Sequence, residues 1–179
     1  MDIRTFTYKS KFGDLILGDY SGKICLCDWK YRRMRGGIDR KISQGLNAPF
    51  VEGRTVLLDQ AIEQLREYFS GKRTTFDLPL KLVGTDFQIE IWKHLQNIPF
   101  GETVSYLELA RLYGDEKAVR AVASANGANA ISIIVPCHRV VGSDGSLTGY
   151  AGGLPVKKKL LTLEGALQSE QTTLNFSYD

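Results

Sequence analysis

A thiol and an imidazole stand side by side in residues 135–140, whose sequence is VPCHRV. A cysteine reacts as its thiolate, and at neutral pH an ordinary cysteine stays mostly protonated unless a base or a positive charge lies nearby. His138 and Arg139 supply one group of each kind. Pro136 has no backbone N–H and fixes its own φ, so it predicts a turn at this point. We therefore interpret Cys137 as a nucleophile rather than as a small buried hydrophobic residue.

Local signals predict the elements that position this cysteine. Residues 131–135 are almost all β-branched, which predicts a short buried strand that ends at the cysteine. Thr85 and Gln88 have the spacing of a capping box, in which each side chain bonds a backbone N–H of the other residue. Ser105 and Glu108 repeat that spacing. Each pair therefore predicts the start of a helix.

A helix-turn-helix unit is predicted between the second capping box and the cysteine. The helix opened by Ser105 ends near Gly114, and Asp115 then caps a further helix that runs to about Asn126. One side of this further helix is apolar, and the other is small and basic, which lets a DNA backbone approach closely. The small and basic side consists of Lys117, Arg120, Ala121 and Ser124. On these residues alone, a DNA-binding face and an ordinary solvated surface are equal alternatives.

The first half of the chain is predicted to be α/β. Strands are predicted at residues 6–8, 14–17 and 23–29, with a hairpin turn between the last two. Apolar residues at helical spacing predict a helix over 58–69. Residues 32–47 are basic and contain glycine, which predicts an exposed loop, and residues 74–82 are predicted to be extended.

Composition narrows the class of protein. Hydrophobic residues make up 43% and charged residues 24% of the chain, as in ordinary globular domains. The sequence has no long apolar span and no apolar core of a signal peptide near Met1, so a cytoplasmic protein is predicted, or a nuclear one in a eukaryote. The net charge of +3 is mild, but residues 117–143 contain no acid, which allows a local basic face.

A series of motifs resembles one known family. In chain order they are GTDFQ at 84–88, IPFG at 98–101, SY at 105–106, RAV at 120–122, Asn129, PCHRV at 136–140, GYAGG at 149–153 and KLLTLE at 159–164. In this order and with these gaps, residues 84 to about 165 resemble the O6-alkylguanine-DNA alkyltransferases. Residues 1–83 resemble the smaller domain of that family, chiefly in FDLPL at 76–80.

The resemblance implies a fold and a reaction. The expected fold is an RNase H-like α/β domain over 1–83, with a small antiparallel sheet and a helix, then a mainly α, winged-helix-like helix-turn-helix domain over 84–167, and a tail at 168–179. The implied reaction is direct DNA repair, in which an alkyl group on O6 of guanine passes irreversibly to Cys137 in a single turnover. The implied protein is a monomer that uses no cofactor or metal and binds double-stranded DNA through the minor groove, with no membrane partner.

The resemblance also implies roles for individual residues. Cys137 is the alkyl acceptor, His138 and Glu164 form a Glu–His–water–Cys relay that generates its thiolate, and Tyr106 donates a proton toward the departing guanine. Arg120 enters the base stack where the damaged nucleotide is flipped out. Further substrate or DNA contacts are implied for Asn129, which braces the turn at the cysteine, for main-chain groups of Cys137, Val140 and Ala151, for Tyr150 as a pocket wall, and for Lys117, Ala121 and Ser124.

The chain departs from the family pattern at a few positions. Ala123 stands where many members have glycine, Ala130 replaces a common proline, and Thr148 replaces a glycine or another small residue. None of these residues belongs to the acceptor chemistry. We expect Ala123 to alter how closely its helix approaches DNA, and Thr148 to narrow the alkyl pocket.

Other functions compete with this interpretation. Alkyltransferase-like proteins bind lesions without a cysteine acceptor, and Cys137 argues against that class. A helix-turn-helix regulator would bind DNA without losing a thiol. A cysteine hydrolase would need a distant histidine, for which the chain offers only His94. A zinc site at Cys25 and Cys27 would need ligands that the segment lacks.

Overall fold

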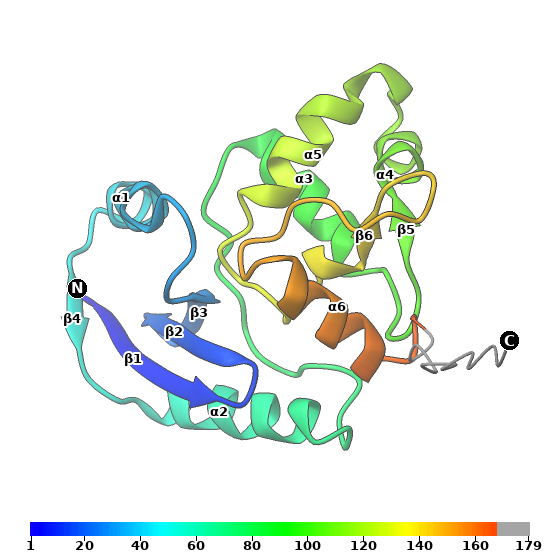
Figure 1. The fold of residues 1–179 in the computed structure, drawn as a ribbon. Coiled ribbons are helices and arrows are strands. Elements are labelled where there is room, and N and C mark those ends of the chain that lie inside the picture. Colours follow the sequence, from blue (N-terminus) through cyan, green and yellow to red (C-terminus); the bar gives the residue numbers. More distant parts are fainter. Residues whose placement is uncertain (168–179) are drawn as a thin grey trace, which may run out of the picture.

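The computed structural model describes residues 1–167, and the tail predicted at 168–179 lies outside the described residues. The N-terminal domain is built on a four-stranded sheet of order β3-β2-β1-β4 (Figure 1). Strands β1 (Ile3–Ser10), β2 (Gly13–Tyr20) and β3 (Lys23–Trp29) are antiparallel neighbours, as predicted. The short β4 (Phe50–Glu52) pairs in parallel with β1 and was not predicted, which makes the sheet mixed.

Helices cover both faces of this sheet (Figure 1). The predicted helix is α2 (Val56–Phe69), which Thr55 caps and whose apolar stripe packs with Leu15 and Leu17 of β2. The prediction of an exposed loop over 32–47 was wrong, because most of it forms α1 (Arg35–Leu46) on the other face. The helical pattern there was weak, since Ile42 is the only buried residue of α1.

A bulge in β3 separates Cys25 from Cys27. The pairing of β2 with β3 shifts register at Gly18 and Asp19, which leaves Cys25 without a paired residue. Cys25 consequently packs in the cluster beneath α1, whereas Cys27 packs in the main core with α2. Within residues 1–167 no group of three or more metal-ligating side chains is placed to hold a metal ion.

The C-terminal domain is mainly helical. It contains α3 (Asp86–Leu95), β5 (Val104–Ser105), α4 (Tyr106–Tyr113), α5 (Val119–Gly127), β6 (Val140–Val141) and α6 (Leu154–Leu163). Both predicted capping boxes are present, at Thr85 and Ser105, and Gly114 ends α4 at a φ of 102°. Asp115 caps a short 3-10 turn, η1 (Glu116–Ala118), and α5 follows that turn directly.

The predicted strand at residues 131–135 was wrong. Only Ile131 pairs with another chain segment, in a single bridge to Cys27. The residues that follow form a turn in which Ile133 has a φ of 71°, an unfavourable value for a β-branched residue. Asn129 holds this turn, because its amide donates to O of Val135 at 2.9 Å and its side-chain oxygen accepts from N of Ile131 at 3.0 Å.

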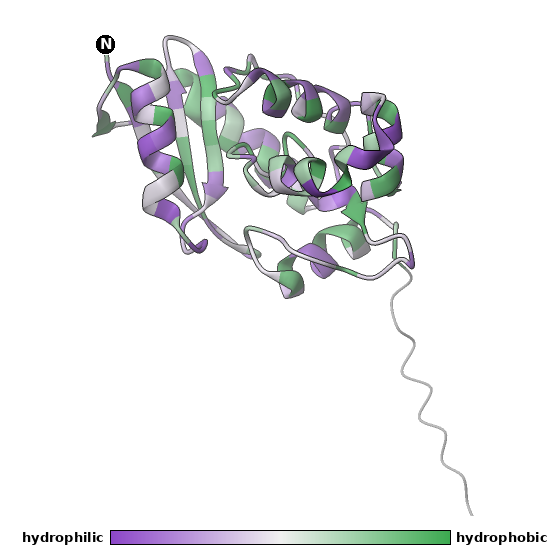
Figure 2. Cartoon of the chain, turned by 90° about the horizontal axis from the view of Figure 1, so that it is seen from above, coloured by the Kyte–Doolittle hydropathy of each residue, from purple (hydrophilic) through white to green (hydrophobic). Residues whose placement is uncertain are grey.

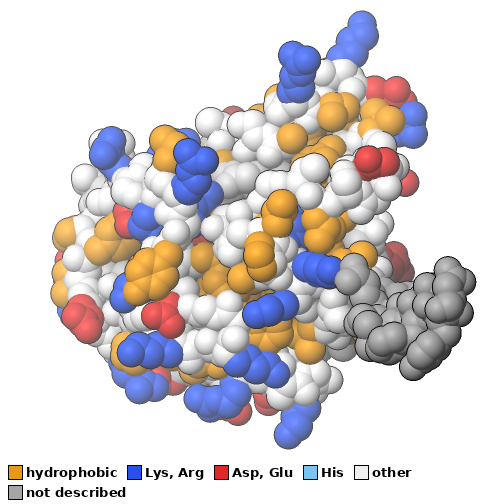
Figure 3. Space-filling model, viewed as in Figure 1, with side chains coloured by type: hydrophobic (Ala, Val, Ile, Leu, Met, Phe, Trp, Pro, Cys, Tyr) orange, Lys and Arg blue, Asp and Glu red, His pale blue; other side chains and the backbone are white. Residues whose placement is uncertain are grey.

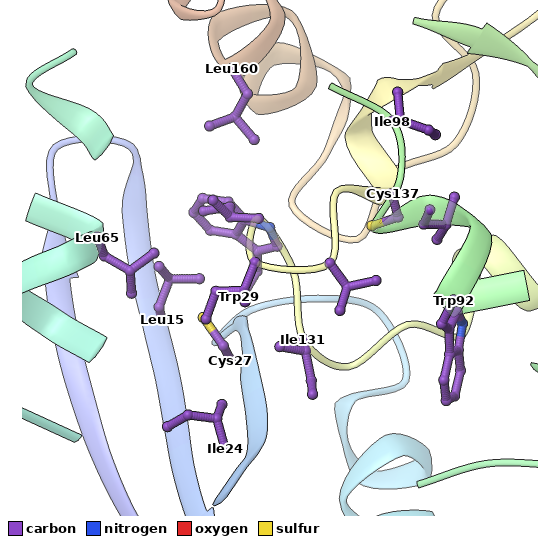
Figure 4. Packing of buried hydrophobic residues seen from close by; sticks show 14 of the residues in the cluster. Leu15, Ile24, Cys27, Trp29, Leu65, Trp92, Ile98, Ile131, Cys137 and Leu160 are labelled. Carbon is purple, nitrogen blue, oxygen red and sulfur yellow. The ribbon is translucent and has the colours of Figure 1, made fainter. Parts of the chain in front are cut away.

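One core joins the two domains. The bridge at Cys27 attaches the turn before Cys137 to the edge strand β3, and Trp29 and Ile131 come from opposite domains into the same cluster (Figure 4). Hydrophobic and hydrophilic residues alternate around the helices (Figure 2), and hydrophobic residues of α2, α3, α4, α5 and α6 belong to the buried core. The segment predicted as extended at 74–82 makes one bridge, between Leu80 and Ile24. No helix among the described residues is long and apolar enough to span a membrane.

Candidate active site and DNA interface

Cys137 opens a buried 3-10 turn, η2 (Cys137–Arg139), and only 4% of it is exposed. Burial raises the pKa of its thiol above the ordinary value, although a hydrogen bond from Asn129 and the cations of Lys157 and Arg32 act in the opposite direction. The resting residue is therefore a neutral thiol. A nucleophile in this state needs a base that accepts its proton during the reaction.

The neighbouring imidazole is held by a buried carboxylate. Nε2 of His138 lies 2.7 Å from Oε1 of Glu164, and His138 is fully buried. Burial raises the pKa of Glu164, but the hydrogen bonds of His138 and Arg139 outweigh it and lower that pKa to about 2. Glu164 is therefore ionised and accepts, so Nε2 of His138 carries the proton. Burial lowers the pKa of His138, which keeps the ring neutral.

This tautomer leaves Nδ1 of His138 as a proton acceptor. Nδ1 is buried and has no hydrogen-bond partner among the described residues. The hydrogen bond of Nε2 thus orients the imidazole, and Nδ1 can act as a base. The ring belongs to the residue that follows Cys137 in the sequence.

Glu164 has further partners that sequence reasoning missed. Tyr68, on α2 of the N-terminal domain, donates its hydroxyl to Oε1 at 2.6 Å. Arg139 donates to both carboxylate oxygens, at 2.9 Å each, and also to O of Ile98. The expectation that Arg139 supplies a positive charge to the thiol is corrected here, because its guanidinium serves Glu164 instead. Burial and the charge of Glu164 raise the pKa of Tyr68, so it remains a donor.

Lys157 was also missed. This fully buried residue of α6 donates from Nζ to O of Val140 at 2.6 Å and to O of Thr148 at 2.9 Å. Burial lowers the pKa of its ammonium to about 8, although Cys137 raises it. Its signal in the sequence was hidden in a run of three lysines at 157–159. Lys157 ties the loop of residues 142–153 to the turn that carries the cysteine.

Two tyrosines lie on the approach to the cysteine. The hydroxyl of Tyr106, the first residue of α4, donates to O of Thr148 at 3.1 Å. Tyr150 accepts a hydrogen bond of 3.1 Å from the indole of Trp29, which lies on β3. Burial and the nearby Cys137 raise the pKa of Tyr150 well above its ordinary value. The phenol of Tyr150 therefore remains protonated at the site.

A cleft of about 870 Å³ opens between the two domains. Arg120, Tyr150 and Ala151 line it, together with Thr148 and Tyr106. Asn126 also lines it, and its amide donates to O of Cys137 at 3.3 Å while its side-chain oxygen has no partner among the described residues. The acceptor thus lies just behind the wall of the cleft.

The predicted helix face has the predicted exposure. Lys117, Arg120, Ala121 and Ser124 are all exposed, whereas Val122 and Ala125 of α5 are buried. Arg120 alone of these four also lines the cleft, so the exposed face of α5 and the cleft meet at this residue. Lys and Arg side chains stand over this part of the molecule in Figure 3.

The comparisons with known proteins agree on one family. Residues 3–82 match the ribonuclease-like domain, and residues 86–166 the DNA binding domain, of 6-O-methylguanine DNA methyltransferase. The chain is 57% identical over 105 residues to a methylated-DNA–protein-cysteine methyltransferase of Methanosarcina barkeri, covering 59% of this chain and 66% of that protein. A relative of the same name from Mycobacterium bovis is 54% identical over 114 residues, covering 64% and 69%.

Solved structures extend this similarity over nearly the whole chain. The Mycobacterium tuberculosis protein OGT, in complex with DNA, has a TM-score of 0.78 at 40% identity and covers 93% of this chain and 94% of its own. A methyltransferase from Methanococcus jannaschii, at 23% identity and a TM-score of 0.60, shares the fold. The chain therefore belongs to the 6-O-methylguanine DNA methyltransferase family.

Proposed function

We propose that this chain repairs DNA directly, by moving the alkyl group of O6-alkylguanine onto Sγ of Cys137 in one irreversible turnover. The observation that carries the assignment is the buried arrangement in which Glu164 orients His138 through Nε2 at 2.7 Å and leaves Nδ1 unpartnered among the described residues. That arrangement supplies a base to a thiol whose pKa burial has raised. Membership of the family supplies the substrate class.

The reaction balances without a further reactant. Nδ1 of His138 takes the thiol proton through one bridging water, and the imidazolium is stabilised by the ionised Glu164. The thiolate attacks the alkyl carbon, so that an S–C bond forms while the C–O6 bond breaks and its electron pair stays on guanine. Guanine takes up one proton, which Tyr106 delivers after its hydroxyl leaves O of Thr148, and the phenolate regains a proton from water as the imidazolium of His138 releases the thiol proton to water. Thiol and alkylguanine thus become thioether and guanine.

The damaged base must leave the duplex to reach the cysteine, since Cys137 is buried behind the cleft. Arg120 is exposed where the face of α5 meets the cleft, a position that suits a side chain filling the gap in the base stack. Ala121 and Ser124 lie on that exposed face, Lys117 lies on η1 directly before it, and the three complete the minor-groove surface in this proposal. Main-chain groups of Val140 and Ala151 contact the substrate in this proposal, although O of Val140 already accepts a hydrogen bond from Lys157. The proposed protein acts as a monomer in the cytoplasm.

A stoichiometry experiment tests the proposal. The protein is mixed with excess duplex that contains O6-methylguanine, and repaired DNA is followed to completion. We expect a plateau at one repaired base per protein, because a thioether is a poor leaving group. Cys137→Ser should repair nothing, whereas the matched control Cys27→Ser should repair normally if it folds. Continued turnover, or binding without repair as for a helix-turn-helix regulator, would contradict the proposal.

A further inference from the structure

The segment between β3 and α1 lines the cleft from the N-terminal domain. We call residues 30–34 the β3–α1 loop. Tyr31 and Arg33 of this loop line the same cleft as Arg120, Ala123 and Gly127 of α5. The side of α5 that carries Arg120, Ala123 and Gly127 and the β3–α1 loop are therefore two walls of one groove, and the cysteine lies behind the wall of this groove.

Three side chains of the loop are exposed, and the ammonium of Lys30 lies 5.6 Å from the centre of the Tyr31 ring. Tyr31 is 80% exposed and Met34 is 83% exposed, which places both among the most exposed large hydrophobic residues of the described chain. Arg33 is exposed, and it makes no hydrogen bond or ion pair with residues 1–167 that would occupy its guanidinium. Single exposed apolar residues are common, but an exposed ring next to an unpaired arginine at a cleft has the composition of a nucleic-acid contact.

The backbone of the loop is nevertheless anchored. Arg32 and Arg35 turn inward and pair with the fully buried Asp28, at 2.8 and 3.0 Å. Arg32 also donates to O of Gly127 at 2.8 Å and to O of Asn129 at 3.2 Å, at the C-terminal end of α5. The loop is thus fixed to the helix whose other end carries Arg120, and its outward side chains are held in place before any ligand binds.

We propose that the β3–α1 loop is the second half of the DNA interface, an inference that rests on the proposed function. Arg33 pairs with a phosphate of the strand that carries the flipped nucleotide, and the ring of Tyr31 packs against a sugar or base next to it. The charge of the two walls favours this occupant, because Lys30, Arg33 and Arg120 all lie along the groove or its loop and residues 117–143 contain no acid. Figure 3 shows Lys and Arg side chains on this face of the molecule.

Binding and reaction separate this inference from the proposed function. Arg33→Ala and Tyr31→Ala are compared with wild type in duplex affinity across a range of salt, and in the rate with free O6-benzylguanine. Arg33→Ala should bind duplex several-fold more weakly and lower the slope of log affinity against log salt by about 0.9, the value for one lost phosphate contact. Tyr31→Ala should weaken binding without changing that slope, and Tyr31→Phe should bind duplex with the affinity of wild type. All variants should react with the free base as wild type does.

The matched control is Arg40→Ala, which removes an exposed arginine of α1 that does not line the cleft. It should leave affinity and salt slope unchanged. Wild-type affinity and slope in both loop variants, or equal losses on duplex and free base, would overturn the inference. A wild-type protein that fails to react even with the free base would instead refute the proposed function.

Discussion

The buried centre around Cys137, His138 and Glu164 and the exposed groove at Arg120 differ in the interactions that determine what each does. Glu164 is 5% exposed and receives hydrogen bonds from His138, Arg139 and Tyr68, so its geometry is fixed by close contacts. Arg120 and the face of α5 are exposed, and in the proposed function they contact DNA through charge and shape. Changes of single atoms should therefore alter chemistry at the centre, whereas changes in the groove should alter only the reaction with duplex DNA.

The largest expected effect is at Glu164. Glu164→Gln removes the charge that stabilises an imidazolium at His138, so the rate of alkyl transfer should fall by about 100-fold, the lower range for general acid–base catalysis. The loss should be the same with duplex and with a free alkylated base, and the apparent pKa of Cys137 should rise. Glu164→Asp is the conservative control that keeps the charge. Weakened DNA binding with an unchanged chemical step would show that Glu164 is not part of a relay.

The stability of the folded protein in acid should depend on the same carboxylate, Glu164. The folded pKa of Glu164 is about 2, below its ordinary value of 4.5. The unfolded state therefore takes up the proton first, so this stability is present above about pH 4.5 and is lost as the pH falls toward 2. The shift corresponds to about 3 kcal/mol. Urea unfolding of wild type and Glu164→Gln from pH 7 to 3 checks this, and parallel pH curves for the two proteins would contradict it.

In the groove, Arg120→Ala should slow repair of duplex by about tenfold or more, because the duplex must be unstacked at a cost of a few kcal/mol. The reaction with a free alkylated base should hardly change. The control is Arg111→Ala, an exposed arginine of α4 outside the cleft that pairs with Glu116. Equal losses on both substrates would assign Arg120 a structural role.

Thr148 lies where groove and centre meet. Its main-chain oxygen accepts from Tyr106 and Lys157, the residue lines the cleft, and its hydroxyl lies 3.5 Å from that of Tyr106. Thr148→Gly keeps the main-chain contacts and removes a stiff side chain, so transfer of benzyl should gain about 1 kcal/mol over transfer of methyl. Competing benzyl and methyl substrates measure this ratio, and an unchanged ratio would place Thr148 outside the alkyl pocket.

The smallest expected effect concerns Tyr68, which positions Glu164 from the other domain. Tyr68→Phe removes one hydrogen bond and should cost about 1 kcal/mol of stability. It should also shift the pH dependence of the alkyl-transfer rate, because the pKa of Glu164 changes when this carboxylate loses a hydrogen-bond donor. Tyr8→Phe, at a half-buried tyrosine of β1 with no hydrogen bond to Glu164, is the control. A stability loss without any change in the pH profile would make Tyr68 purely structural.

Local signals predicted much of the C-terminal domain. The capping boxes at Thr85 and Ser105 and the glycine end of α4 involve residues at most four positions apart, so their physics is visible in a short window. The turn at Ile133 was not predictable in this way, because a positive φ at a β-branched residue is imposed by Asn129 and by the bridge to Cys27. The run of apolar residues at 131–135 indicated burial, but it did not indicate whether the backbone forms a strand or a turn.

Long-range contacts explain what else was missed. Tyr68 meets Glu164 across 96 positions of sequence, and no motif couples them. Helix α1 escaped detection because its sequence contains Gly36, Gly37 and Gly45, yet Gly45 is required where the helix packs against Val83. The cysteine and its imidazole were found because a thiol beside an imidazole is recognisable from residue types alone, whereas Glu164 was expected only from the family resemblance. Whether they act as a relay stays a prediction.

The most direct measurement is the mass of the intact protein after reaction with duplex that contains O6-methylguanine, followed by mapping of its peptides. We expect a gain of one methyl group, found only on the peptide that contains Cys137, with Cys25 and Cys27 unmodified. An unchanged mass after the DNA has been repaired, or a methyl group on another residue, would contradict it.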